Sequence, residues 1–238
     1  MAEISSGRIG STKASAFGST AWQMRRARAR ARRGAAVALR RLAFACALAL
    51  LATGACVSSR APVVSVRAAA PGLAPLAPPP DRAVVVFVQP TKRTYDWAAI
   101  YEDDRFVAVV QDRSHAVHET APGAHRYAVV SEAADFLDAE LAGGRVYFVR
   151  VEPRMGGVRM RYTLIPIAAG LERWDELPGW LAATHAATPN ARALEWVDAH
   201  AEGAARLRER YLEKWLGRAD RPALAPRDGV AAWPPGAD

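Results

Sequence analysis

The chain has 238 residues, 51% of them hydrophobic, and a formal net charge of +8 at pH 7. Ten of the 32 Lys and Arg residues and one of the 24 acidic residues precede Cys56, which leaves 22 basic and 23 acidic residues after it. A nucleic-acid-binding protein keeps its basic surface on the folded part, so this distribution excludes nucleic-acid binding. Cys46 and Cys56 are the two cysteines, so no disulfide or thiolate metal site can form after Cys56.

Residues 24–56 have the three parts of an export signal, which are a cationic start, a short apolar stretch and small residues at a cleavage site. The cationic start contains eight arginines between residues 25 and 41, and positive charge of this kind stays on the cytoplasmic side. Residues 42–52 are apolar, but a spanning helix needs about 20 residues, so this stretch is too short for a permanent anchor. We therefore predict that residues 1–55 are a cleaved signal peptide, with Met24 as the true start because the signal then has a normal length.

The four residues Thr53, Gly54, Ala55 and Cys56 resemble the lipobox of bacterial lipoproteins. In that family the signal is cut before the cysteine, whose thiol then carries diacylglycerol with fatty acyl chains such as palmitate. Thr53 departs from the leucine that is commonest there. The resemblance implies lipid attachment at Cys56 and a domain that faces the periplasm, and Val57, which is not aspartate, favours the outer membrane over the inner. An ordinary cleaved signal followed by a chance cysteine is the alternative.

The stretch after the cysteine is rich in Pro and Ala and has no apolar periodicity. Such segments are extended, because they cannot bury enough surface to fold. We predict that residues 56–81 are a tether, whose residues 57–80 would reach roughly 75 Å when fully extended at about 3.1 Å per residue.

Residues 82–168 contain short β-rich runs that recur every 8–12 residues with turn signals between them, which predicts an antiparallel β-sandwich of seven or eight strands. Residues 83–89 are a continuous apolar run, as expected for a strand covered on both faces. Residues 97–102 and 106–111 flank a turn at residues 103–105 and should form a hairpin. The further predicted strands are residues 116–120, 125–131, 136–141, 146–152 and 158–164.

In the last predicted strand, Val158, Met160, Tyr162 and Leu164 alternate with polar residues, which predicts one buried and one solvated face. The order of strands and turns over residues 82–167 resembles a family of small bacterial envelope-lipoprotein domains in the style of PEGA-type sandwiches. The resemblance is carried by Tyr101, Asp103, Val107, Pro122, Gly123, His125, Tyr127, Tyr147, Phe148 and Val151. It implies a β-sandwich on a lipid anchor and supplies no catalytic residues.

Residues 169–218 are predicted to be a connection followed by an amphipathic helix. In the connection, Trp174, Leu177, Trp180 and Leu181 are expected to cap one open end of the sandwich. The helix should begin after Asn190 as N-cap and end near Gly217. Its apolar stripe comprises Leu194, Val197, Ala201, Ala204, Leu207, Tyr211 and Trp215. Residues 219–238, which contain several prolines and no periodicity, are predicted to be a disordered tail.

Candidate sites are few. His115 and His118 are three residues apart in a strand and should point to opposite faces, so we expect no metal site there. The acidic residues Glu132, Asp135, Asp138 and Glu140 are expected to form a solvated edge. The chain has no G-x-S-x-G turn and no phosphate-binding G-x-x-x-x-G-K loop, and we expect no cofactor.

The sequence predicts a non-enzymatic lipoprotein that serves as a binding or structural component of the bacterial cell envelope. The alternative is an accessory subunit of a secretion or surface assembly that docks on an envelope partner through the C-terminal helix. The docking residues would be Leu194, Trp196, Val197, Leu207, Tyr211 and Trp215. Packing of this stripe on the sandwich is the competing interpretation, and a hydrolase with an unrecognised site is a third hypothesis.

Overall fold

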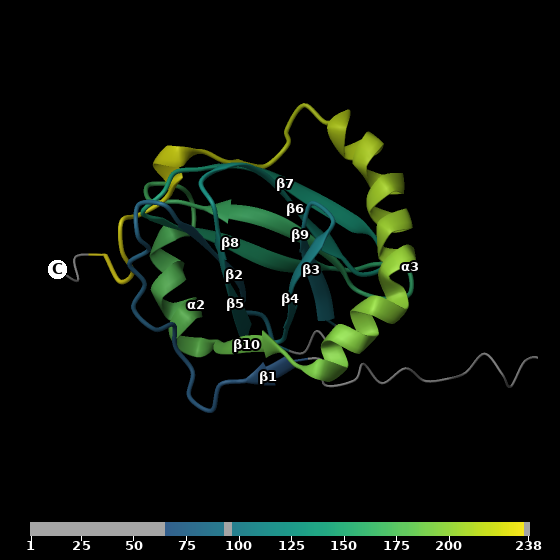
Figure 1. Ribbon diagram of the computed structural model, residues 1–238, viewed down its shortest axis with the longest axis horizontal. Coiled ribbons are helices and arrows are strands. Elements are labelled where there is room, and N and C mark those ends of the chain that lie inside the picture. The colour runs from purple at the N-terminus through teal and green to yellow at the C-terminus, as the bar shows by residue number, and fades with distance from the viewer. Residues whose placement is uncertain (1–64, 93–96, 236–238) are drawn as a thin grey trace, which may run out of the picture. The chain divides into compact units, whose positions relative to one another are not determined.

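The computed structural model describes residues 65–92 and 97–235. Within these ranges the chain forms eleven strands in two sheets, a long helix α3 and a short helix α2 (Figure 1). The prediction of a mainly β protein with one long C-terminal helix is therefore confirmed.

The larger sheet has six strands in the order β1, β10, β5, β2, β8, β9. The pairs β10–β5 and β2–β8 are parallel, and the other three pairs are antiparallel. The strands are β1 Ser65–Arg67, β2 Ala83–Gln89, β5 Ser114–Thr120, β8 Arg145–Arg154, β9 Arg161–Ile167 and β10 His185–Pro189.

The smaller sheet has five strands in the order β11, β7, β6, β3, β4, and only β11–β7 is a parallel pair. The strands are β3 Trp97–Glu102, β4 Arg105–Gln111, β6 Gly123–Val130, β7 Ala134–Leu141 and β11 Ala223–Leu224. The predicted hairpin is confirmed, because β3 and β4 are joined by a tight turn in which Asp103 has a φ of 49°. Aspartate tolerates this left-handed conformation better than most residues.

Strand β2 shows why the larger sheet needs another layer of structure on each of its two faces. All seven of its residues are buried, as its apolar run predicts. Val85 and Phe87 pack in the core between the two sheets, whereas Val86 and Val88 pack on the outer face of the larger sheet. A strand with two apolar faces requires a layer on each side.

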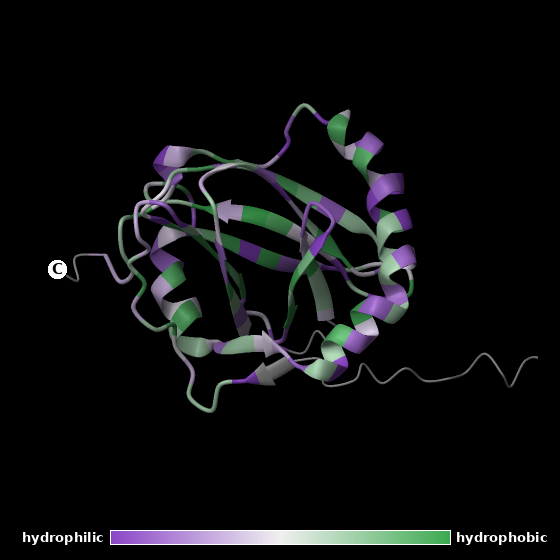
Figure 2. Ribbon diagram, in the orientation of Figure 1, coloured by the Kyte–Doolittle hydropathy of each residue, from purple (hydrophilic) through white to green (hydrophobic). Residues whose placement is uncertain are grey.

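The helices supply the outer layers. Helix α3, Ala191–Leu216, packs on the outer face of the smaller sheet, and helix α2, Leu177–Ala183, packs on the outer face of the larger sheet. The domain therefore has four layers, two sheets between two helices (Figure 1). Colouring by hydropathy shows α3 with hydrophilic and hydrophobic sides, as an amphipathic helix requires (Figure 2).

The predicted ends of the long helix are confirmed. The side chain of Asn190 accepts a hydrogen bond from the N–H of Ala193 at 2.9 Å, which satisfies one free donor of the first turn. At the other end, the N–H of Gly217 donates to the carbonyl of Glu213 at 3.1 Å.

The predicted sandwich needs two corrections. Strands β2 to β9 do lie within residues 82–168, but β1, β10 and β11 from outside this range complete the sheets, and three pairs are parallel. The strand predicted at residues 158–164 begins at Arg161 instead. Val158 is 96% exposed, because the preceding residues form a loop rather than a strand.

The connection before α3 is also corrected. Trp174, Leu177, Trp180 and Leu181 cover the outer face of the larger sheet and do not cap an open end. The physical reason is that β2 and β8 present apolar side chains on this face, which water would otherwise contact. The short helix η1, Trp174–Glu176, precedes α2, and β10 then adds to the sheet edge.

Both terminal segments are more ordered than predicted. Residues 223–224 form β11, and a short helix η2 spans Pro226–Asp228. Trp233 is buried, and its backbone exchanges two hydrogen bonds of 2.8 Å with the backbone of Leu76. The prediction of a disordered tail over residues 219–238 is therefore wrong for the part that the structure describes. The predicted tether is likewise shortened, because residues 65–67 form β1 and Leu73 and Leu76 pack on the larger sheet.

Candidate functional site

A group of polar side chains lies between the two sheets, around the carboxylate of Glu102. Glu102 is the last residue of β3, and the alternation of the strand places it on the same inner face as Ala98 and Ile100. Only 8% of its side chain is exposed. An acidic side chain at a core position is costly unless other groups pair with it and hydrogen-bond to it.

The partners of Glu102 come from both sheets. Thr120 of β5 donates its hydroxyl to Oε1 at 2.9 Å, and the Tyr127 hydroxyl of β6 donates to the same oxygen at 3.4 Å. Arg105 of β4 donates to Oε2. The Nδ1 atom of His125 lies 2.9 Å from Oε1, and the Nε2 atom of His118 lies 3.4 Å from Oε2. We call Glu102 and these five side chains the Glu102 cluster.

The charges within the Glu102 cluster follow from its surroundings. Burial by itself would raise the pKa of Glu102, but hydrogen bonds from Arg105 and Thr120, together with nearby His118, lower this pKa to about 2. Burial lowers the pKa of His118, and it raises the pKa of Tyr127, which the negative charge of Glu102 raises further. At neutral pH the cluster therefore contains an ionised Glu102 beside neutral His118 and Tyr127.

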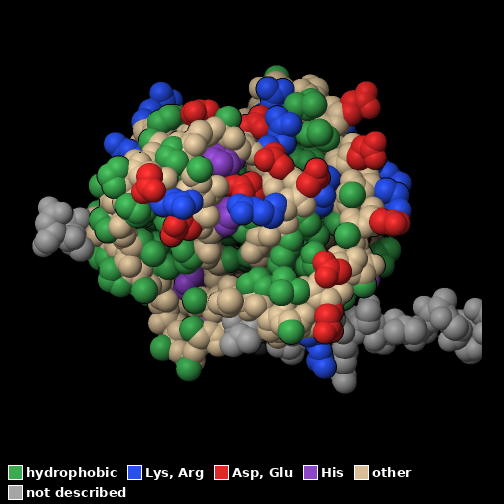
Figure 3. Space-filling model, in the orientation of Figure 1, with side chains coloured by type: hydrophobic (Ala, Val, Ile, Leu, Met, Phe, Trp, Pro, Cys, Tyr) green, Lys and Arg blue, Asp and Glu red, His purple; other side chains and the backbone are tan. Residues whose placement is uncertain are grey.

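A shallow depression of about 480 Å³ adjoins this cluster at His125. It is lined by residues of β6, β7 and β11 and by Asp103, and charged and histidine side chains gather on the face seen in Figure 3. Across it, Arg126 donates to Asp138 at 2.8 Å. His125 uses both ring nitrogens, since its Nε2 lies 2.9 Å from the carbonyl of Ala121. The cluster therefore joins the sheets, and His125 does not present a free ring nitrogen for proton transfer.

The second histidine of β5 is His115, and its position confirms the prediction that His115 and His118 point to opposite faces of the strand. His115 and His118 point to opposite faces, because His115 contacts the hydroxyl of Thr184 at 2.9 Å whereas His118 lies beside Glu102. Burial also lowers the pKa of His115. Across residues 65–92 and 97–235, no three His, Cys, Asp or Glu side chains are grouped as a metal site requires.

The predicted docking residues of α3 lie mainly against the smaller sheet. Trp215 and Val197 are buried, and the ring of Trp215 lies 5.7 Å from that of Phe136. Trp196, Leu207 and Tyr211 are partly buried on the same surface, and Leu194 is half exposed. The structure thus packs most of these docking residues, fully or in part, against their own domain. Cys56, the predicted lipid-attachment residue, lies outside the described residues.

The four acidic residues that were expected to be solvated have different environments. Asp138 pairs with Arg126, and burial raises the pKa of Asp135, which lies 3.6 Å from Arg218. Glu132 accepts several hydrogen bonds from a distant loop, whereas Glu140 is exposed beside the depression. The prediction of a single solvated edge is therefore wrong for Glu132 and Asp135.

Sequence reasoning missed the Glu102 cluster, although one signal was present. Glu102 continues the alternation of Ala98 and Ile100, and Thr120 and His118 share the inner-face parity of Ala116. Polar residues at such core positions indicate a buried network. The sequence does not show which strands are neighbours, so it could not show that these polar residues meet.

Comparisons with protein families, curated proteins and solved structures found no match to this chain. The resemblance to envelope-lipoprotein domains stays a prediction that rests on the residues quoted above. Among the described residues, no helix has both the length and the apolar character needed to cross a bilayer.

Proposed function

We propose that this chain is a non-enzymatic lipoprotein, anchored at Cys56, that serves as a binding or structural component of the bacterial cell envelope. The single observation that carries the proposal is the sequence of residues 24–56, with its arginine block, short apolar stretch and cysteine after Gly54 and Ala55. The domain would face the periplasm, and Val57 favours the outer membrane.

The charge distribution supports the proposal. Nearly all of the net positive charge lies before Cys56 and would be removed with the signal, which leaves a nearly neutral domain. Two or three acyl chains on Cys56 would give stable anchoring, because each buried CH₂ group contributes about 0.8 kcal/mol.

The position of β1 defines how far the domain can lie from the anchor. Residue 65 begins β1, so nine residue steps separate it from Cys56, and their fully extended length is about 30 Å. This is less than half of the reach predicted for a tether of residues 56–81. The anchored domain would therefore stay close to the membrane surface.

Docking on an envelope partner through α3 stays the alternative. A partner that used Trp215 would have to displace it from the smaller sheet, and Val197 is also buried in this domain. Leu194 and Leu216 are the residues of this helix that remain available as exposed apolar contacts.

Detergent partition tests the proposal. Wild-type protein expressed in a bacterial host should enter the detergent phase after extraction of the membranes, and Cys56→Ser protein should remain in the aqueous phase. Recovery of the wild-type protein in the aqueous phase, like the variant, would contradict the anchor.

A further inference from the structure

The loop between β8 and β9 contains two apolar side chains that are almost fully exposed to solvent. Met155 is 88% exposed and Val158 is 96% exposed, which is more than any other large apolar side chain in the described part of the chain. Exposed Arg154 and Arg159 flank them, and residues 153–160 contain no acidic residue. We call residues 154–159 the apolar loop.

The apolar loop is held in one conformation by Glu132 of the β6–β7 turn. Its carboxylate accepts hydrogen bonds from the N–H groups of Gly157, Val158 and Arg159 at 2.8, 2.7 and 2.6 Å. Arg161 donates to the same carboxylate at 3.0 and 2.8 Å, which balances its charge. The loop backbone is therefore ordered before binding, which lowers the entropy cost of a contact through Met155 and Val158.

Gly156 shows that this conformation requires a close backbone approach. A Cβ atom at Gly156 would lie 2.0 Å from the carbonyl oxygen of Arg159 and 2.9 Å from Glu132. Glycine is therefore the residue that fits at this point of the loop.

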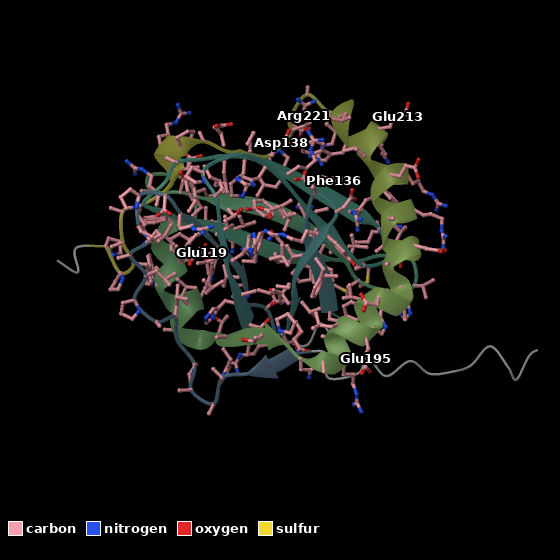
Figure 4. The ribbon with its side chains drawn as sticks, in the orientation of Figure 1. Glu119, Phe136, Asp138, Glu195, Glu213 and Arg221 are labelled. Atoms are coloured by element: carbon pink, nitrogen blue, oxygen red, sulfur yellow. The ribbon has the colours of Figure 1, made fainter. Side chains whose placement is uncertain are left out.

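The apolar loop lies near the N-terminal part of α3. The guanidinium of Arg159 lies 5.4 Å from the ring of Trp97, which contacts Trp196 of α3 with ring centroids 4.2 Å apart. The first turn of α3 follows β10, whose Pro189 pairs with Ser65 of β1. Figure 1 shows β1 beside the start of α3, and Figure 4 places Glu195 at the same end.

We propose that the apolar loop is a second membrane contact, which inserts Met155 and Val158 into the interface of a bilayer that contains anionic phospholipid. Arg154 and Arg159 would lie at the level of the lipid phosphates, which attract basic side chains. This inference rests on the proposed function, because two apolar side chains alone bind a bilayer weakly. A lipid at Cys56 would hold the loop at a high local concentration beside the surface.

The charge and shape favour a lipid surface over a protein groove. The two exposed side chains lie in one loop between exposed Arg154 and Arg159, and apolar side chains flanked by basic ones can enter an anionic headgroup layer.

The absence of cysteine after Cys56 makes a direct test simple. In the processed lipoprotein the thiol of Cys56 would be blocked by its lipid, so Val158→Cys introduces one free thiol for an environment-sensitive fluorophore. Leu171→Cys is the matched control, because Leu171 is 53% exposed and follows the opposite end of β9. Both labelled proteins would be reconstituted into vesicles of phosphatidylethanolamine with or without phosphatidylglycerol.

We expect the Val158 probe to shift to the blue and to lose several-fold in quenching by aqueous iodide when phosphatidylglycerol is present. Arg154→Gln should reduce this protection, and the Leu171 probe should remain fully quenched. A Val158 probe as accessible as the Leu171 probe, on protein that floats with the vesicles, would overturn the loop contact and leave the anchor intact. Protein that neither floats nor carries acyl chains would overturn both.

Discussion

Two carboxylates of this domain, Glu102 and Glu132, each have a pKa lowered to about 2, but by different means. Glu102 is buried between the sheets and is paired by side chains from β4, β5 and β6. Glu132 lies at a turn and is bound mainly by backbone N–H groups of one loop, which are the largest cause of its low pKa. The comparison indicates that Glu102 stabilises the whole sandwich, whereas Glu132 sets the shape of a local surface.

The largest expected effect is that of Glu102→Gln. Removal of the charge weakens the buried hydrogen bonds from Thr120 and Tyr127, at an expected cost of about 2 kcal/mol, whereas the 64% exposed side chain of Arg105 can be solvated by water. For a domain of this size, the melting temperature should fall by about 4 to 8 °C in calorimetry. The control is Glu119→Gln, an exposed residue of β5 that should change the melting temperature little. A Glu102→Gln protein as stable as this control would contradict the assigned role.

The dependence of stability on pH sharpens the comparison. The folded-state pKa of Glu102 is about 2 and its unfolded value is near 4.5, so its stabilisation is present above pH 4.5 and is lost as the pH falls through 2. Burial keeps His118 neutral, so stability should already decrease as the pH falls below about 6.5. Urea unfolding between pH 7 and pH 1.5 would measure both steps. In Glu102→Gln the lower step should become shallower, and an unchanged slope would count against the pairing.

Gly156→Ala should have a smaller effect that stays local. The added Cβ atom would collide with the carbonyl of Arg159, so the apolar loop must shift, at an expected cost of about 1 kcal/mol. Hydrogen exchange at Val158 should increase while the strands remain protected. Gly179→Ala in α2 is the control, because a Cβ atom there meets open space and alanine favours the helix. Equal behaviour of the two variants would show that the loop is not tightly fitted.

Glu132→Gln should have the smallest effect on global unfolding. The amide side chain can still accept some hydrogen bonds from the loop, but it loses the charge that attracts Arg161. We expect faster hydrogen exchange at Gly157 and Arg159 with nearly the same melting temperature, and Glu140→Gln on the neighbouring strand serves as control. A large fall in melting temperature would mean that Glu132 supports the whole domain, as Glu102 does.

The part of the fold that the sequence could predict is the part with regular side-chain patterns. The apolar run of β2, the hairpin of β3 and β4, and α3 with its Asn190 cap all have local signals, and all are confirmed. Strands β1, β10 and β11 have five residues or fewer and join the sheets by backbone pairing, so no periodicity marks them. Parallel pairing between β2 and β8 likewise depends on contacts far apart in the chain.

The two carboxylate sites show the same limit. Glu102 could have been suspected from its core parity in β3, but its partners come from three other strands. Glu132 was expected to belong to a solvated edge, and nothing local indicated that a loop 25 residues away would donate to it. Local patterns predict elements, whereas the pairing of polar groups requires the tertiary structure.

The central claim is that the mature chain begins at a lipid-modified Cys56. Mass spectrometry of the N-terminal peptide from membrane-extracted protein tests this most directly. The account predicts a peptide that starts at Cys56 and carries the mass of a diacylglycerol, with or without a further acyl chain. A peptide that extends through residues 24–55, or an unmodified Cys56, would contradict it.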